Sequence, residues 1–261
     1  MNDPAWRQLN IRYPGSTAAE REQHAIAHLG RVLPAAEAAG LITTWSYIRK
    51  DAWRVRYLPA GHGTGPDLAE RLLTDDVAWN RDIYEPEAHA FGGDESMAAA
   101  HLLFHRDSRQ LLDYLALPSI DRRERSLILC TQLMRAAGLD INEQGDVWAK
   151  VLEHRAEYGD QPATVDPTIW AQFTSDTRSL LLGAPRTRNA WHTAFTDAGT
   201  TLRDLRETGR LTRGIRAIIA LHVIFHWNRL GLDARAQATQ ARAARDAVFG
   251  EAPPSYRASA P

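Results

Sequence analysis

The amino-acid sequence predicts an α+β protein with its sheet in the first third of the chain and helices in the rest. Before residue 93, several segments alternate apolar and polar residues as half-buried strands do. From residue 94 onward, apolar residues recur with the spacing of a helix. A chain of 261 residues with 44% hydrophobic content can also bury a large core. We therefore expect one domain over residues 1–250, sheet-rich in 1–93 and helical in 94–250, and a proline-containing disordered tail at 251–261.

The first 93 residues predict a ferredoxin-like layer with the element order β-α-β-β and helices on one face of the sheet. Pro14-Gly15 ends the first strand, and Ser16 or Thr17 then caps a helix that stops at Gly40. A tight turn at Lys50-Asp51 joins the next two strands. The expected strands are Trp6–Tyr13, Ile42–Arg49, Trp53–Leu58 and Val77–Tyr84, and the expected helices run to about Ala39 and over Asp67–Leu73.

The remainder of the chain predicts a helical bundle. Asp94 is a good N-cap for its first helix, and Gly138 is a good stop for its second. Residues 251–261 contain three prolines and two serines, which favours a disordered tail. The expected helices are Ser96–His105, Asp121–Gly138, Asn142–Tyr158, Thr168–Leu182, Trp191–Glu207, Thr212–Leu230 and Ala234–Phe249.

The composition argues against several classes of protein. The formal net charge is -1, and a nucleic-acid partner usually requires a basic excess, so we expect no direct nucleic-acid binding. No segment approaches the ~20 apolar residues of a membrane span, and the N-terminus lacks the basic-then-apolar order of a signal peptide, so we expect the cytoplasm. Glycine-rich nucleotide motifs and the Gly-x-Ser-x-Gly elbow are absent, and we expect no cofactor. The single cysteine, Cys130, is expected to be a small buried hydrophobe.

Histidines recur at the helical spacing that can place two imidazoles on one face, as a metal site requires. None of these pairs contains the glutamate of the His-Glu-x-x-His motif, and no pair of cysteines supplies further ligands. We therefore expect no metal. The pairs are His24/His28, His101/His105 and His222/His226.

Near the C-terminus, a histidine, an asparagine and an arginine interrupt an apolar helical run in His226-Trp-Asn-Arg229. From Ile215 the run is apolar almost all round, as in a helix packed on several sides. His226 is therefore expected at the inner edge of a core. A partly buried imidazole titrates near neutrality and can act as a general acid or base, whereas a core histidine bonded to a carbonyl is the structural alternative.

Arginines recur on the two central strands. Because side chains alternate in direction along a strand, Arg54 and Arg56 share one face. Arg12 and Arg49 lie on neighbouring strands, and if they face the same way, the four guanidinium groups form a basic floor. Burying such a floor is costly without an acidic partner, which a bound carboxylate could supply. A solvated sheet face with Asp or Glu neighbours is the alternative.

Four segments become distinctive when they are taken together and in order. They are Trp45-Ser-Tyr-Ile-Arg49 with Trp53-Arg-Val-Arg56, Ile83-Tyr-Glu-Pro-Glu87 with Phe91-Gly-Gly93, Leu103-Phe-His-Arg-Asp-Ser108, and His226-Trp-Asn-Arg229. In this arrangement the chain resembles the C-terminal domain of lantibiotic dehydratases, whose free-standing form is called the thiopeptide-type bacteriocin biosynthesis protein. The resemblance extends from about Trp6 to Phe249.

The resemblance implies a role in maturing a ribosomally made precursor peptide. In split systems of this family, a glutamyl-tRNA-dependent dehydratase partner glutamylates Ser or Thr, and the small protein eliminates glutamate to leave dehydroalanine or dehydrobutyrine. Elimination needs a base for the Cα proton, stabilisation of enolate-like charge, and a grip on the departing glutamate. The implied partners are the precursor peptide and the dehydratase, and a homodimer is left open.

The resemblance also implies roles for single residues. Arg54 and Arg56 match the family's strand arginines and would hold carboxylate charge, and His226 would carry the proton. The implied substrate-binding residues are Arg49, Arg81, Tyr84, His222, Asn228 and Arg229.

Two positions depart from the family pattern. Pro86 stands where many members have an arginine, in a motif like Tyr-x-Arg-Glu, and Arg81 is the candidate replacement. Ile224 stands four residues before the asparagine, where the family histidine is often found, so His222 and His226 are both candidates for the proton carrier.

These departures keep two alternatives open. The same fold serves pyridine synthases, which join two dehydroalanines by a formal cycloaddition and expel the leader peptide, with a tyrosine or an acid orienting the tautomer. A non-catalytic subunit that binds the precursor peptide is the other alternative, because exposed Trp and Tyr around an arginine groove suit recognition. The paired strand arginines favour elimination.

Overall fold

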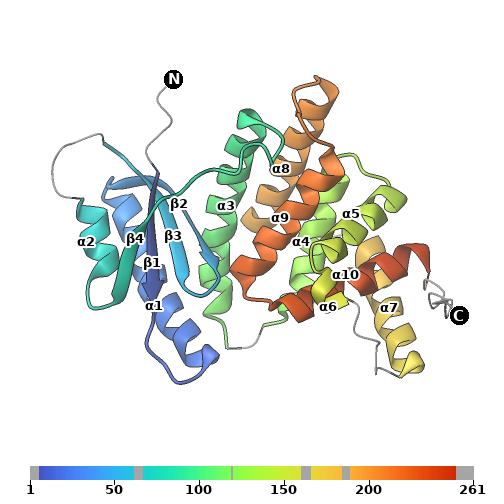
Figure 1. Ribbon diagram of the computed structural model, residues 1–261, viewed down its shortest axis with the longest axis horizontal. Coiled ribbons are helices and arrows are strands. Elements are labelled where there is room, and N and C mark those ends of the chain that lie inside the picture. The colour runs from blue at the N-terminus through green and yellow to red at the C-terminus, as the bar shows by residue number, and fades with distance from the viewer. Residues whose placement is uncertain (1–5, 62–66, 119, 160–165, 184–188, 251–261) are drawn as a thin grey trace, which may run out of the picture.

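The computed structural model describes residues 6–61, 67–118, 120–159, 166–183 and 189–250. A four-stranded sheet lies at one end of the molecule and a group of helices forms the other end (Figure 1). The α+β prediction, with the sheet first and the helices after it, is therefore confirmed. The predicted tail at 251–261 lies outside the described residues.

The sheet has the strand order β2-β3-β1-β4, and each pair of neighbours is antiparallel. This is the order of a ferredoxin-like layer, in which the helix between the first two strands carries the chain across the sheet. The last strand is shorter than the predicted Val77–Tyr84. The strands are β1 (Arg7–Arg12), β2 (Ile42–Arg49), β3 (Trp53–Pro59) and β4 (Ala78–Asp82).

Two helices, α1 (Ala18–Ala38) and α2 (Leu68–Thr74), cover one face of this sheet. Thr17 is the N-cap of α1: its side chain accepts from the Glu20 N–H, and the Glu20 side chain accepts from the Thr17 N–H. Apolar residues of the strands and of α1 form the core between the layers, with Leu9, Val55 and Leu29 fully buried.

The remaining helices pack around a second part of the same apolar core. Their bounds are α3 (Asp94–Leu115), α4 (Arg122–Ala136), α5 (Ile141–Glu153), α6 (Ala156–Gly159), α7 (Pro167–Leu182), α8 (Ala190–Glu207), α9 (Ile215–Leu230) and α10 (Ala234–Phe249). Within the described residues, each helix is too short or too polar to cross a membrane.

Three predicted helix boundaries were wrong. Gly93 rather than Asp94 is the N-cap of α3, and its φ of 109° favours glycine. The same helix continues ten residues past His105, because Leu111, Leu112 and Leu115 extend its buried stripe. The predicted helix Asn142–Tyr158 is divided into α5 and α6.

One helix fixes the position of the sheet relative to the bundle. Helix α3 lies along the free edge of β2, where the Trp45 N–H donates to His105 Nδ1 at 3.2 Å and the Tyr47 N–H donates to Ser108 Oγ at 3.3 Å. These side chains satisfy backbone donors that an edge strand would otherwise leave open. The side chains of α3 are therefore held at a defined place beside the sheet.

Candidate active site

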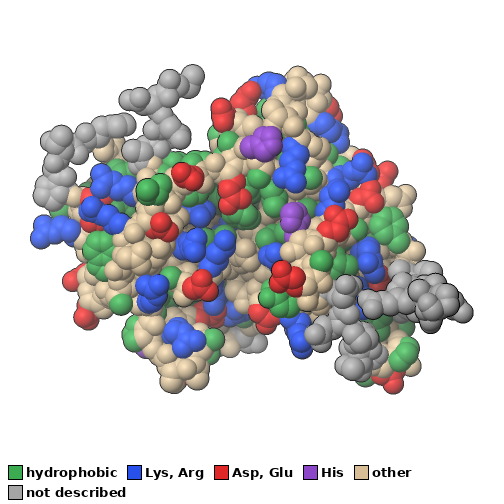
Figure 2. Space-filling view, in the orientation of Figure 1, with side chains coloured by type: hydrophobic (Ala, Val, Ile, Leu, Met, Phe, Trp, Pro, Cys, Tyr) green, Lys and Arg blue, Asp and Glu red, His purple; other side chains and the backbone are tan. Residues whose placement is uncertain are grey.

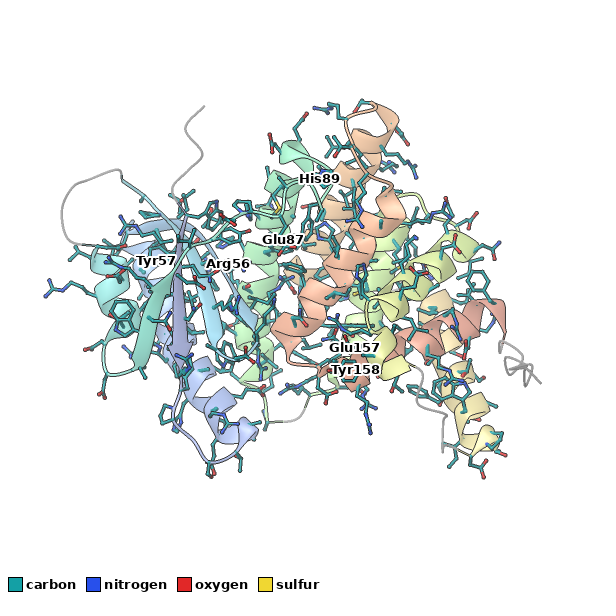
Figure 3. The ribbon with its side chains drawn as sticks, in the orientation of Figure 1. Arg56, Tyr57, Glu87, His89, Glu157 and Tyr158 are labelled. Carbon is teal, nitrogen blue, oxygen red and sulfur yellow. The ribbon has the colours of Figure 1, made fainter. Side chains whose placement is uncertain are left out.

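The sheet face opposite α1 and α2 carries the two strand arginines. Arg54 pairs with Asn10 of β1 and Arg56 pairs with Gln8, so both arginines lie on one face among polar side chains. The alternation of the strand predicts this placement. Tyr57, the next residue of β3, points away from Arg56 toward α2 (Figure 3).

Arg56 is partly buried and is held from two sides. Its Nε donates to Gln8 Oε1 at 2.8 Å, and its guanidinium carbon lies 4.1 Å from the centre of the Tyr84 ring. The second contact has the geometry of a cation–π interaction. Burial lowers the pKa of Arg56, while Tyr84 and Glu87 raise it. Arg56 and Glu87 both lie in the region between the sheet and the helices (Figure 3).

A hydrogen-bonded tyrosine and histidine adjoin this arginine. The Tyr84 hydroxyl lies 2.8 Å from His101 Nε2 of α3, and the Trp6 ring packs against the His101 ring with 4.6 Å between centroids. A cation, a phenol and an imidazole therefore meet where the sheet adjoins α3. On the face shown in Figure 2, Lys and Arg side chains gather at this boundary.

Two of the predicted site arginines lie elsewhere. Arg49 lies on the covered face of the sheet, where it forms an ion pair with Glu22 of α1. Arg81 lies on the same covered face, and its Nε donates to Glu70 Oε2 of α2 at 2.6 Å. Arg81 is thus turned away from Arg56 and does not take the place of the arginine that Pro86 replaces.

His226 and Arg229 lie inside the helical part, bound to Asp107 of α3. Asp107 Oδ2 lies 2.9 Å from His226 Nδ1 and accepts from Arg229 Nε at 2.8 Å, and Oδ1 accepts from Trp191 Nε1 at 2.7 Å. Burial alone would raise the pKa of Asp107, but His226 and Arg229 outweigh it and lower the pKa to about 2. We call these four residues the Asp107 cluster. It joins α3, α8 and α9.

His222 and Asn228 have other neighbours than Arg56 among the contacts of the described residues. His222 packs against the rings of Phe91 and Phe104, and its two ring nitrogens have no hydrogen-bond partner among the described residues. Burial lowers the pKa of His222 to about 3, so its imidazole is neutral over the physiological range. Asn228 Oδ1 accepts from Gln237 Nε2 of α10 at 2.9 Å.

Phe104 stands between the two groups of polar side chains. The Arg229 guanidinium carbon lies 4.5 Å from its ring centre, and the His101 ring lies 6.4 Å from it. His226 is only 1% exposed, and its Nε2 has no partner within the described part of the chain. The expected edge position of His226 is therefore an interior one, behind an aromatic layer.

The structure adds two residues that sequence reasoning did not assign to a site, His101 and Asp107. The sequence places His101 in a helical histidine pair, but nothing in the pattern brings it to Tyr84. For Asp107 a signal existed, because a carboxylate in an apolar helix needs a buried basic partner. Across the ranges that the structure describes, no three His, Cys, Asp or Glu side chains group as a metal site would require.

This arrangement can bind an anion and move a proton. Arg56 offers a fixed cation, and the Tyr84–His101 pair lies beside it at the same boundary. Arginine binds carboxylates through two parallel N–H donors, and an imidazole is the side chain best suited to proton transfer near neutrality.

Comparison with known protein families identifies one model, described as lantibiotic biosynthesis dehydratase C-term, which matches residues 6–248. No curated protein matches the chain.

Several solved structures share the fold, and three of them illustrate the match. The tRNA dependent lantibiotic dehydratase MibB from Microbispora sp. 107891 is 20% identical with a TM-score of 0.58, and the match covers 95% of this chain and 28% of that one. The pyridine synthase TbtD, from thiomuracin biosynthesis, is 15% identical with a TM-score of 0.58, and the match covers 94% and 97%. TsrL is 15% identical with a TM-score of 0.57, and the match covers 95% and 99%. The chain thus spans about a quarter of the dehydratase and nearly the whole of the other two proteins.

Proposed function

The chain belongs to the lantibiotic dehydratase C-terminal family, and we propose that it eliminates glutamate from glutamylated Ser or Thr residues of a ribosomally made precursor peptide. The product would carry dehydroalanine or dehydrobutyrine, and a separate glutamyl-tRNA-dependent partner would supply the glutamylated peptide. The observation that carries the proposal is the meeting of Arg56, Tyr84 and His101 on the sheet face opposite α1 and α2.

The elimination breaks the Cα–H and Cβ–O bonds, and it forms the second Cα–Cβ bond and a bond between the base and the proton. A base removes the Cα proton of the glutamylated residue, the Cα–Cβ double bond forms, and the Cβ–O bond breaks as glutamate leaves with the electron pair. Arg56, with Arg54 beside it on the same face, holds the carboxylate charge that grows on the leaving group. The Tyr84–His101 pair takes up the proton, a contribution of typically about 100- to 10,000-fold.

In this proposal His101 has the role that the family resemblance gave to His226. His226 faces Asp107 with one ring nitrogen and the buried interior with the other. In this role His226 holds α9 against α3 and so fixes the helices that pack around Phe104. Arg229 acts in the same way.

The experiment uses purified protein with a peptide glutamylated at serine and follows the peptide by mass spectrometry. Loss of the glutamate mass without added partner enzyme supports elimination. Arg56→Ala should leave glutamylated peptide to accumulate, with a rate lower by about 100-fold or more, because a transition-state charge contact is lost. Unchanged turnover in Arg56→Ala would remove the carboxylate-holding role.

Arg81→Ala is the matched control. Its side chain is also a strand arginine in an ion pair, but it lies on the covered face and is 66% exposed. Turnover should stay within about twofold of the parent, because the contact that is lost joins β4 to Glu70 of α2 on the face away from Arg56. If Arg81→Ala were as inactive as Arg56→Ala, the assignment of the site to the opposite sheet face would be wrong.

Pyridine synthesis is the second candidate, and two observations favour it. The chain matches nearly the full length of a pyridine synthase, and Arg81 does not replace the arginine missing at Pro86. The same assay, with a peptide carrying two dehydroalanines, separates the two reactions. A released leader and a pyridine product would select the cycloaddition, and binding without any change of mass would select a non-catalytic subunit.

A further inference from the structure

A second basic site lies in the helical part, in a pocket of about 510 Å³ between the α8–α9 connection and the start of α5. Its lining includes three arginines from α8, the connection and α9. On the face shown in Figure 2, Lys and Arg side chains gather near the upper end of the helices. The lining residues are Glu143, Arg206, Leu211, Thr212, Arg213, Gly214, Ile215 and Arg216.

The arginines of this pocket keep donors available for a ligand. Arg213 Nη1 donates to the Ala90 carbonyl at 3.0 Å, and Arg216 Nη1 forms an ion pair with Asp146 in which both side chains are nearly half exposed. Each contact uses one end of a forked guanidinium, whose remaining N–H groups can bind a carboxylate. The lining also contains one carboxylate, Glu143, whose Oε2 accepts from the Asp140 N–H at 3.0 Å.

The start of α9 adds positive potential to the same pocket. Gly214 is its N-cap and supplies no side-chain hydrogen bond, so the N–H groups of Ile215 and Arg216 have no acceptor within this sixteen-residue helix, whereas the Ala217 N–H donates to the Gly214 carbonyl. A Cβ atom at Gly214 would meet nothing within 4 Å, and the backbone φ of −61° is open to any residue. The space that a capping aspartate would fill is therefore available to a ligand carboxylate.

The pocket is also connected to the candidate active site. The Thr212 N–H donates to the Gly92 carbonyl at 3.0 Å, and Arg213 reaches the Ala90 carbonyl. Both carbonyls belong to the segment between β4 and α3, which begins beside Tyr84 and carries Glu87 and His89 (Figure 3). One segment of the chain therefore contacts both the pocket and the candidate active site.

We propose that this pocket binds an acidic segment of the precursor peptide at a distance from the residue that reacts at Arg56. The assignment of the peptide as the ligand rests on the proposed function. Peptide carboxylates pair with Arg213 and Arg216, and Leu211 and Ile215 in the same lining contact apolar side chains beside them. The pocket is open to solvent, so a peptide segment can bind there and dissociate again.

The test measures binding and turnover separately. The binding probe is a fluorescein-labelled peptide of glutamate and leucine, compared by anisotropy with the same peptide carrying glutamine for glutamate. The parent protein should prefer the glutamate peptide, with an affinity that falls as salt rises. Arg213→Ala/Arg216→Ala should weaken that binding by about tenfold, since two charge-assisted contacts are lost.

Three further measurements decide the outcome. Arg210→Ala is the control, because Arg210 lies on the same connection but pairs with Glu95 outside the pocket, and it should bind the probe normally. Gly214→Asp should also weaken binding, because its carboxylate caps α9 and occupies the place of the ligand. Preference of the parent protein for the glutamate peptide, without elimination of glutamate from the glutamylated peptide, would count against the proposed function only. Equal binding of the two peptides, or equal loss in Arg210→Ala, would overturn the pocket assignment.

Discussion

Replacement of Asp107 by asparagine tests whether the buried charge of the Asp107 cluster holds α3, α8 and α9 together. Asp107 is fully buried and faces three donors, from His226, Arg229 and Trp191. Asparagine keeps the shape but removes the charge and turns an NH₂ group toward groups that also donate. Because Arg229 is 1% exposed, its charge would remain buried without a counter-ion. Loss of one partner of such a buried pair costs about 3–5 kcal/mol.

The assay is urea unfolding followed by circular dichroism, with the free energy taken from linear extrapolation. Asp197→Asn is the matched control, because Asp197 also pairs with an arginine, Arg106, but both side chains are about half exposed. Its cost should stay below about 1 kcal/mol. A cost in Asp107→Asn no larger than in this control would refute the argument that the buried charge decides stability.

If Asp107→Asn does not fold, the double variant Asp107→Asn/Arg229→Met keeps the reasoning testable. The double variant removes the buried Arg229 charge together with the carboxylate. Its unfolding midpoint should therefore lie at a higher urea concentration than that of Asp107→Asn alone. A double variant that is less stable than the single one would show that Arg229 contributes by packing on Phe104 rather than by its charge.

Three other changes have defined outcomes. His222→Met should stabilise the protein by about 1 kcal/mol or more, since two buried ring nitrogens lack partners in the described structure. Turnover should persist in this variant, and its loss would show that His222 belongs to the active site. The pKa of His222 is lowered from 6.5 to about 3, so unfolding favours protonation and stability should fall as pH falls from 6.5 toward 3, less steeply in His222→Met. Gly199→Ala should destabilise the protein, because its Cβ would lie 2.3 Å from the Leu133 carbonyl oxygen. In Gly30→Ala the added Cβ meets nothing within 4 Å, so the free energy of unfolding should rise by about 0.5–1 kcal/mol. Equal unfolding midpoints of the two variants would contradict both predictions.

The sequence predicted correctly which face of the sheet some of the arginines occupy, but not all of them. Alternation placed Arg54 and Arg56 together, and Arg12 lies on the same face. Arg49 does not, because Arg49 pairs with Trp53 rather than with Ala52. A two-residue turn would have paired Arg49 with Ala52, on the face of Arg54. A shift of one residue moves a side chain to the other face, and hairpin length is hard to read from one sequence.

The histidines show a second limit. The apolar surroundings of His226 predicted its burial, but burial alone does not distinguish a proton carrier from a member of an ion cluster. The distinction depends on Asp107, which lies 119 residues earlier in the chain. Likewise, the pairing of Tyr84 with His101 follows from the docking of α3 on β2, a tertiary contact that no local pattern contains.

Helix α3 contacts the sheet, the helices α8 and α9, and the candidate active site. Its His105 and Ser108 hold the edge of β2, its Asp107 holds α8 and α9, and its His101 reaches Tyr84 beside Arg56. His101 and Arg56 belong to different layers, so their separation is set by how α3 sits between the layers and by no contact within either one. A change in the Asp107 cluster can therefore alter catalysis without touching substrate. Such a change should lower turnover in proportion to the shift of α3.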